Sequence, residues 1–293
     1  MNPTDPAAAS ASGASASAFA AADRAAAGLS ATSPAGAPAA DRRGTARRAV
    51  VTGASSGIGA ATVAALRADG WDVVGVARRA DRLEDLAART GASFVAADIT
   101  SDEDVARLVA EVTAGGPVHA VVNNAGGALG NEPVAQADLD GWRQMYELNV
   151  LGTIRVTNAF LPALREAEGD VVVVTSTAAH EPYEGGGGYV AAKFAERVAT
   201  RTLRLELVGE PLRVIEIAPG MVQTEEFSLT RFGGDQAKAD AVYAGVPDPL
   251  VAADIAEAIR WTLTQPAHVN VDTLIVRPRA QGSYTKTHRI AGA

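Results

Sequence analysis

Three side chains have the types and the spacing needed to move a proton to or from an oxygen atom. Tyr189 and Lys193 are four residues apart, so they would lie on one face of a helix. A free tyrosine has a pKa of about 10, but a nearby ammonium group favours the phenolate and lowers that pKa. Ser176 supplies a hydroxyl thirteen residues before Tyr189. Such a set can protonate a carbonyl oxygen or deprotonate an alcohol.

The segment before Ser176 predicts where this chemistry takes place. Residues 171–175 form a short apolar run that is typical of a buried strand, so the Ser176 hydroxyl emerges at its carboxyl end. Ligands of doubly wound sheets bind at that edge. Residues 189–207 are amphipathic and predict the helix that brings Tyr189 and Lys193 to Ser176. A lone Tyr-x-x-x-Lys is common by chance, so the assignment depends on the whole combination.

A glycine-rich turn near the start of the folded part is suited to hold a dinucleotide. Residues 48–52 read as a strand that runs into Gly53, Gly57 and Gly59, and residues 60–69 read as a helix. Backbone N–H groups and the positive helix end then face the phosphates, and glycine lets the chain approach closely. The spacing differs from G-x-G-x-x-G. The alternative is an ordinary tight turn.

The end of the second expected strand distinguishes between two dinucleotides. A carboxylate about 20 positions past the glycines would bind the ribose 2′-hydroxyl of NAD. Here Arg78 stands 19 residues beyond Gly59 and is followed by Arg79. A guanidinium group can pair with a 2′-phosphate through two parallel bonds, so the sequence predicts NADP (NADPH). The alternative is a solvated arginine at the start of a helix.

Polar side chains also follow the third and fourth expected strands. Asp98 is placed to accept a hydrogen bond from an adenine amino group, and Asn123 is placed to fix the backbone beside the cofactor. The alternative for both residues is local stabilisation of a turn.

The elements that must position these residues alternate between strand and helix. Seven short apolar runs predict strands that are covered on both faces, at residues 49–51, 73–76, 94–97, 120–122, 171–174, 214–217 and 274–276. Helical patterns lie between them. The alternation predicts an α/β fold, a single-domain, Rossmann-type doubly wound parallel sheet of about seven strands with helices on both faces. We expect this domain to span residues 48–280, followed by a C-terminal tail at 281–293.

The composition limits the remaining possibilities. The net charge of −8 argues against nucleic-acid binding, and no apolar run is long enough to predict a membrane span. The chain has no cysteine, and its four histidines lack metal-ligand spacing, so we expect no metal site. Residues 1–47 are rich in Ala, Ser, Gly and Pro and predict a disordered extension, with a transit peptide as an alternative.

Residues 47–280 resemble the short-chain dehydrogenase/reductase family. The matching motifs are TGASSGIG at 52–59, NNAG at 123–126, Asn149, Ser176, YVAAK at 189–193 and PGMVQT at 219–224. The resemblance implies that Asn149, Ser176, Tyr189 and Lys193 are the catalytic set and that Asn149 orders a water next to Lys193. It implies a cytoplasmic homo-tetramer. The cofactor-binding residues would be Gly53, Ser55, Ser56, Gly57, Ile58, Gly59, Arg78, Arg79, Asp98, Ile99, Asn123, Ala125, Gly126, Tyr189, Lys193, Pro219, Gly220, Val222 and Thr224.

Four segments also resemble a subgroup, the NADP-dependent 3-hydroxy acid dehydrogenases. These segments are residues 126–133, 176–186, 225–239 and 265–278. The subgroup acts on serine, allo-threonine and related 3-hydroxy acids, so the resemblance implies such a substrate. Ser176, Tyr183, Tyr189 and Arg231 would then bind it, with Arg231 facing the carboxylate. The alternatives are a reductase of another carbonyl substrate and a non-catalytic NADP-binding sensor.

Overall fold

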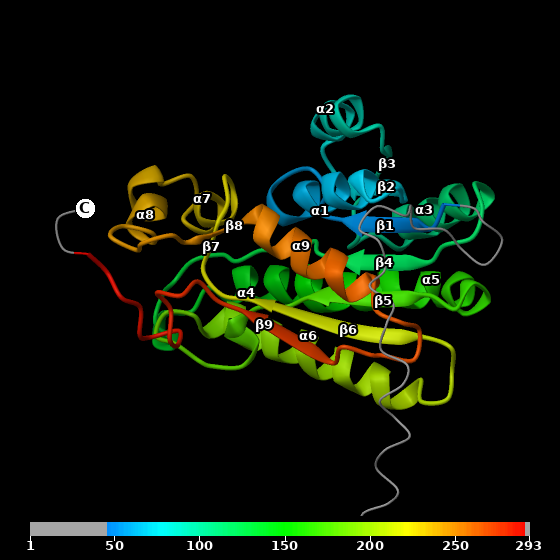
Figure 1. Cartoon of the computed structure of the whole chain (residues 1–293). Coiled ribbons are helices and arrows are strands. Elements are labelled where there is room, and N and C mark those ends of the chain that lie inside the picture. Colours follow the sequence, from blue (N-terminus) through cyan, green and yellow to red (C-terminus); the bar gives the residue numbers. More distant parts are fainter. Residues whose placement is uncertain (1–45, 291–293) are drawn as a thin grey trace, which may run out of the picture. The chain divides into compact units, whose positions relative to one another are not determined.

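A computed structural model describes residues 46–290, so the expectation for the extension falls almost wholly outside the described part. Within that part, a seven-stranded parallel sheet has the order β3-β2-β1-β4-β5-β6-β9 (Figure 1). This confirms the predicted α/β fold. The strands are β1 (Arg48–Thr52), β2 (Asp72–Ala77), β3 (Ser93–Ala96), β4 (Ala120–Asn123), β5 (Asp170–Val174), β6 (Arg213–Pro219) and β9 (Thr273–Val276).

The central strands form because both of their faces are buried. Every residue of β5 and of β6 is buried, which matches the many valine and isoleucine residues of these two segments. In the register of these two strands Val171 pairs with Val214 and Val172 with Ile215. The first pair contributes to the hydrophobic core on one face of the sheet and the second pair to the core on the other face.

Helices cover both faces of the sheet. Leu66 of α1 and Ile259 of α9 share one core, whereas Leu108 of α3 and Phe160 of α5 share the other. In the described part, no helix has the length and apolarity of a membrane span. The α-helices are α1 (Gly57–Ala68), α2 (Ala80–Thr90), α3 (Asp102–Ala114), α4 (Leu139–Tyr146), α5 (Thr153–Ala167), α6 (Gly187–Glu206), α7 (Phe227–Arg231), α8 (Gln236–Ala241) and α9 (Ala252–Leu263).

Strands β1 and β4 lie next to each other, and the chain reverses its direction across the sheet at this point. Their carboxyl ends are tied together by Thr52 and Asn124. The Thr52 hydroxyl accepts from the backbone N–H of Asn124 at 3.0 Å, and the Asn124 side chain donates to the Thr52 carbonyl at 3.0 Å. The glycine turn and the segment after β4 therefore meet at the position where doubly wound sheets bind ligands.

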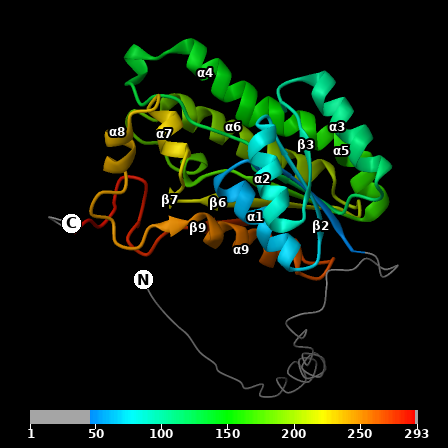
Figure 2. The ribbon, with the colours of Figure 1, turned by 90° about the horizontal axis from the view of Figure 1, so that it is seen from above.

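Beyond the carboxyl ends of β6 and β9, short elements and the C-terminal segment pack together (Figure 2). Strands β7 (Val222–Gln223) and β8 (Leu250–Val251) form a small second sheet. The described part of the expected tail contacts this region: Gln281 accepts from Met221 N–H at 2.9 Å, and Ile290 N–H donates to the carbonyl of Gly245 at 2.7 Å.

Candidate active site

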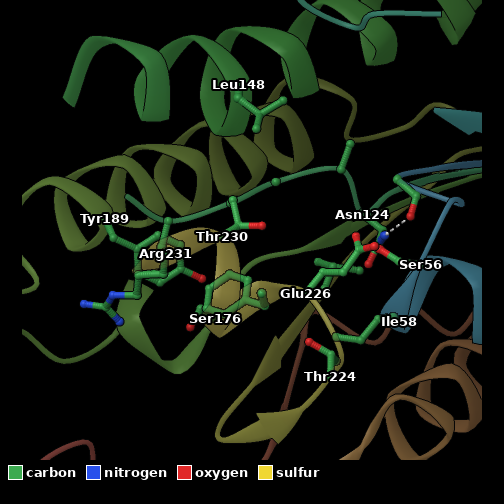
Figure 3. A pocket seen from close by; sticks show the side chains of 18 of the residues that line it. Ser56, Ile58, Asn124, Leu148, Ser176, Tyr189, Thr224, Glu226, Thr230 and Arg231 are labelled. Atoms are coloured by element: carbon green, nitrogen blue, oxygen red, sulfur yellow. Dashed lines mark hydrogen bonds between the residues drawn. The ribbon is translucent and has the colours of Figure 1, made fainter. Parts of the chain in front are cut away.

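A cavity of about 780 Å³ opens along the carboxyl ends of the strands. Its wall includes Ser56 and Ile58 from the glycine turn, Ser176 after β5, and Thr224 before α7 (Figure 3). This volume lies within the roughly 300–1,000 Å³ of typical ligand sites. Within residues 46–290, no three His, Asp or Glu side chains come together in a way that could hold a metal ion.

The glycine turn has the backbone conformation of a phosphate cradle. Gly53 and Gly57 have φ of +67° and +51°, which residues with a Cβ rarely adopt. At Gly59 a Cβ would lie 2.2 Å from the carbonyl oxygen of Gly53, so no side chain fits there. The turn runs into the N-terminus of α1, where unpaired N–H groups and the helix dipole favour an anion. The turn therefore fits the pyrophosphate of a dinucleotide.

Most of the predicted cofactor-binding residues lie in the wall of this cavity. They are Gly53, Ser55, Ser56, Gly57, Ile58, Arg78, Arg79, Asp98, Ile99, Ala125, Gly126, Tyr189, Lys193, Pro219, Gly220, Val222 and Thr224. Gly59 lies just behind the wall, packed on Gly53. Asn123 is buried at the end of β4 and donates to the Thr157 hydroxyl at 2.9 Å, so it supports the wall from within the sheet.

The two predicted arginines have different partners. The Arg78 side chain is 74% exposed and lies 4.0 Å from the Asp98 carboxylate. Both Nη atoms of Arg79 donate to the Glu226 carboxylate, at 2.8 and 2.6 Å, and Nη2 also donates to Ser55 Oγ at 2.8 Å. Arg79 thus joins the glycine turn to the start of α7. Arg78 is the more available of the two for a ligand phosphate.

Asp98 has one oxygen engaged in its own turn. Its Oδ1 accepts from the N–H and the hydroxyl of Thr100 at 2.9 and 2.7 Å. Its Oδ2 is the atom near Arg78. Local stabilisation of the turn, the alternative considered from the sequence, is therefore present for Asp98, and the side chain still faces the cavity.

Tyr189 and Ser176 are brought together at the carboxyl end of β5, as the spacing predicts. Tyr189 is on the first turns of α6 and is 6% exposed. Ser176 Oγ accepts from Ala178 N–H at 3.0 Å, which leaves its hydroxyl proton available to a ligand. The Tyr189 ring packs edge-on against Phe227 of α7, with centroids 5.8 Å apart.

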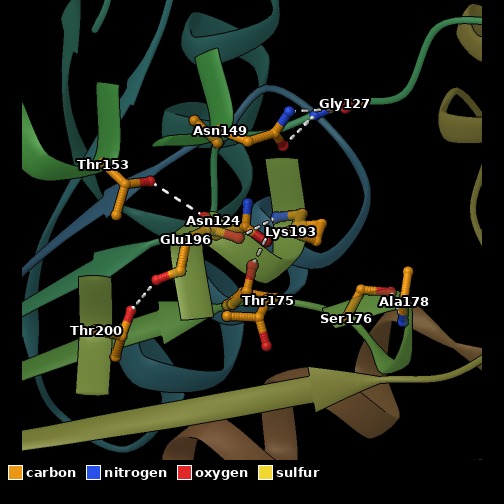
Figure 4. Close-up of polar contacts among 12 residues, drawn as sticks. Asn124, Gly127, Asn149, Thr153, Thr175, Ser176, Ala178, Lys193, Glu196 and Thr200 are labelled. Carbon is orange, nitrogen blue, oxygen red and sulfur yellow. Dashed lines mark hydrogen bonds and ion pairs between the residues drawn. The ribbon is translucent and has the colours of Figure 1, made fainter. Parts of the chain in front are cut away.

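Lys193 lies one turn after Tyr189 on the same helix. Its Nζ donates to the carbonyl of Val174 at 3.1 Å and to the Glu196 carboxylate at 2.7 Å. Asn149 is fully buried in a π-helical segment, Glu147–Gly152, and its side chain exchanges two bonds with the backbone of Gly127 (Figure 4). A Cβ on Gly126 would lie 2.7 Å from Asn149 Oδ1 and 3.3 Å from Lys193 Nζ, so Asn149 and Lys193 flank the same small space.

The electrostatics of Tyr189 differ from the expectation in one respect. Burial raises the pKa of the Tyr189 phenol above its usual value, and the charge of Lys193 and a hydrogen bond with Ser176 lower it only in part. Lys193 acts in the predicted direction, but the loss of water on burial outweighs it. The phenol is therefore held in its protonated form.

The far end of the cavity holds Arg231 and two stacked tyrosine rings. The Arg231 guanidinium donates to the carbonyl of Gly130 at 3.1 Å and lies 5.5 Å from the Tyr183 ring centroid. Tyr183 stacks on Tyr284 with a centroid distance of 3.8 Å. Arg231 and Tyr284 line the cavity, and Tyr183 stands behind Tyr284 with its hydroxyl buried and without a hydrogen-bond partner.

Sequence reasoning missed several residues at this site. Tyr284 and Gln281 belong to the expected tail, yet both line the cavity. Glu226 lines it and pairs with Arg79. The sequence assigned no role to these side chains, because each contact joins segments that are far apart in the chain.

Comparisons with known proteins agree with this geometry. The profile of the short chain dehydrogenase family matches residues 47–231. A serine 3-dehydrogenase of Rhizobium radiobacter is 43% identical over 232 residues, which cover 78% of this chain and 92% of that protein. An uncharacterized oxidoreductase of Mycobacterium tuberculosis is 55% identical over 247 residues, covering 83% and 96%. A closed form of serine dehydrogenase complexed with NADP+ superposes with a TM-score of 0.78 at 36% identity, covering 83% of this chain and all of that one.

The chain belongs to the short-chain dehydrogenase/reductase family. It is an oxidoreductase, and the serine dehydrogenase structure to which it is similar is a complex with NADP+, the dinucleotide predicted from Arg78. The resemblance to the 3-hydroxy acid dehydrogenases is likewise confirmed at the level of sequence relatives.

Proposed function

We propose that the protein interconverts a small 3-hydroxy acid and its semialdehyde or ketone, with Tyr189 as the acid and base. NADPH, when bound, supplies the hydride for reduction, and NADP+ accepts it in oxidation. The Tyr189 hydroxyl gives its proton to the carbonyl oxygen, and the Ser176 hydroxyl donates a hydrogen bond to the same atom. Both side chains line the cavity at the end of β5, and Lys193 stabilises the phenolate that forms.

The proposed substrate class rests on how the cationic side chains of the cavity wall are paired with carboxylates. Four cationic side chains line it. Lys193 pairs with Glu196 and Arg79 pairs with Glu226, and the Arg78 guanidinium lies 4.0 Å from Asp98. Within residues 46–290, no carboxylate forms an ion pair with Arg231. An arginine held in place by Gly130 and Tyr183 supports the binding of an anionic group of the substrate.

The position of Tyr284 relative to Tyr189 and Arg231 supports a short substrate. The pKa of the Tyr284 phenol is raised well above its usual value, first by burial and then by Tyr183 and Tyr189, whereas Arg231 lowers it. Tyr284 therefore lies within electrostatic reach of both Tyr189 and Arg231. A molecule that carries a carboxylate a few bonds from its carbonyl group can meet both residues. Serine and allo-threonine, named for relatives and for the subgroup, have this form.

Replacing Arg231 by leucine should raise the KM for a 3-hydroxy acid by about tenfold or more, which corresponds to about 1.4 kcal/mol. The KM for a neutral aldehyde of similar size should change by less than threefold, since only the charged substrate loses a partner. The measurement is a set of steady-state assays with serine, allo-threonine, other 3-hydroxy acids and neutral aldehydes. An aldehyde that carries a sulfonate tests whether any anion suffices.

A matched control is Arg201→Leu, which removes an exposed arginine of α6 outside the cavity and should leave both KM values unchanged. If Arg231→Leu affects acid and neutral substrates equally, Arg231 does not select for the anion. If neutral ketones are reduced well and no 3-hydroxy acid is oxidised, the reading as a reductase of another carbonyl substrate replaces this one. Absence of turnover with every substrate, together with tight NADPH binding, would favour a sensor.

Assembly into a homo-tetramer and a cytoplasmic location remain predictions. Exposed apolar side chains on α4 and α6 support self-association: Leu139, Tyr146, Val198 and Leu205 are 58%, 46%, 58% and 75% exposed.

A further inference from the structure

A buried carboxylate lies directly beneath the lysine of the proposed catalytic set. Glu196 is 2% exposed and stands three residues after Lys193 on α6. Its Oε2 is 2.7 Å from Lys193 Nζ, and its Oε1 accepts from the Thr153 hydroxyl of α5 at 3.2 Å (Figure 4). The side chains of Lys193 and Glu196 are 5% and 1% exposed, so water screens the pair very little.

Burial of an ion pair is a poor way to stabilise a fold. Removing two charges from water costs several kcal/mol per ion, and well-packed apolar residues often stabilise as much or more. Without Glu196, the Lys193 ammonium would keep only the Val174 carbonyl as a hydrogen-bond partner among the described residues. The carboxylate therefore matters first of all for Lys193.

The charges agree with that interpretation. Burial alone would lower the pKa of Lys193, but the charge of Glu196, the charge of Tyr189 and the hydrogen bond to Glu196 together outweigh it, and the pKa is raised. Burial raises the pKa of the Glu196 carboxyl, and the charge of Lys193 opposes that change. Each group keeps its partner ionised, as a short hydrogen bond between an ammonium and a carboxylate requires.

We propose that Glu196 is a positioning residue that fixes Lys193 Nζ against β5 and keeps it protonated while the Tyr189 phenol exchanges its proton. The inference rests on the proposed role of Tyr189. Two of the three ammonium hydrogens are directed to Val174 and Glu196, which leaves one donor for the cavity. Glu196 touches neither the cavity nor the reacting atoms, so it acts only through Lys193.

Other charged and titratable groups also lie around Lys193, Glu196 and Tyr189. The charge of Glu216 of β6 acts on Glu196, but the Glu216 carboxylate is itself bonded by Thr175, Thr273 and His180. The groups that act on the phenol of Tyr189 are Lys193 and Glu196 of α6, Ser176 after β5, and Tyr183 and Tyr284 at the far end of the cavity. Of these, Glu196 is the only carboxylate among the described residues that bonds Lys193.

In the profile of kcat/KM for carbonyl reduction against pH, activity falls on the alkaline side. The variant Glu196→Gln should move this alkaline limb to lower pH by about one unit or more. Loss of the negative charge lowers the pKa of Lys193, so a neutral lysine appears at lower pH. Where Lys193 remains charged, the negative charge of Glu196 no longer opposes its effect on Tyr189, so the pKa of the phenol falls. Both changes remove the reactive protonation state as the pH rises, so the two effects have the same sign.

The measurement is kcat/KM for reduction between about pH 6 and pH 10.5 at saturating NADPH, a window that brackets the usual tyrosine and lysine pKa values. Glu206→Gln is the matched control, because it removes the same charge from an exposed position at the end of α6. The pH profile of Glu206→Gln should superpose on that of the parent protein. Glu196→Asp keeps the charge but retracts it by one methylene, and its limb should lie between those of the parent and the glutamine variant.

An unchanged alkaline limb in a folded Glu196→Gln protein that still binds NADPH would overturn the proposal, as would an equal shift in Glu206→Gln. Should the glutamine variant fail to fold, Glu196→Asp decides: a limb displaced toward lower pH supports the role, and one that coincides with the parent's overturns it. If Tyr189→Phe retains activity, the proposed function itself fails. If Tyr189→Phe is inactive and Glu196→Gln leaves the limb in place, only the role of Glu196 fails.

Discussion

Replacing Tyr189 by phenylalanine is expected to lower kcat by about a thousandfold, within the roughly 10²–10⁴-fold that a positioned acid or base contributes. The Tyr189 phenol is the proposed proton donor to the carbonyl oxygen, and the serine hydroxyl is too weak an acid to replace it. The ring that remains still packs against Phe227. Binding of NADPH should change little, because the glycine turn and Arg78 lie at the other end of the cavity.

Two measurements separate the chemical role from a structural one. Single-turnover assays report the loss in the chemical step, and titration of NADPH fluorescence reports cofactor binding. Tyr146→Phe is the matched control, because it removes a hydroxyl from a tyrosine of α4 that is 46% exposed, and it should behave as the parent. Activity of Tyr189→Phe within tenfold of the parent, about 1.4 kcal/mol in barrier height, would refute the role of the phenol.

The sheet could be predicted because its strands carry their own signal. β5 contains a run of four valines and β6 is rich in valine and isoleucine, and a parallel strand that is buried on both faces has that pattern. The glycine turn could also be predicted, because the positions of Gly53 and Gly59 leave no room for a Cβ and so require glycine. In each case the physical cause acts within a few residues of the chain, so the sequence shows it locally.

The polar contacts that complete the site could not be predicted in this way. Glu196 falls on an amphipathic helix, where the pattern of apolar positions does not tell that a carboxylate points inward beneath Lys193. Glu226 meets Arg79 across 147 positions of sequence, and the Tyr284 N–H meets the Glu181 carboxylate across 103. Such pairs depend on the relative placement of loops that no local propensity encodes. The net effect of burial on the pKa of Tyr189 was missed for the same reason.

Arg78→Asp is expected to reverse the cofactor preference from NADPH to NADH. The Arg78 side chain is mostly exposed at the mouth of the cavity and has only a 4.0 Å contact with Asp98, so it is available to the 2′-phosphate. Arg79 is engaged by Glu226 through two bonds and is therefore expected to contribute less. An aspartate removes the attraction, repels the phosphate, and provides an acceptor for the ribose 2′-hydroxyl of NADH.

The size of the change follows from the strength of charged hydrogen bonds. Each bond to a charged group contributes about 1.5–3 kcal/mol, and screening at an exposed site reduces this, so the ratio of kcat/KM for NADPH to that for NADH should fall by at least about a hundredfold. Arg89→Asp on α2 is the matched control, because it makes the same charge change outside the cavity and should leave the ratio unchanged. Equal kcat/KM for the two cofactors in the unmutated protein would contradict the argument, since an available arginine at this position should discriminate between them by its charge alone.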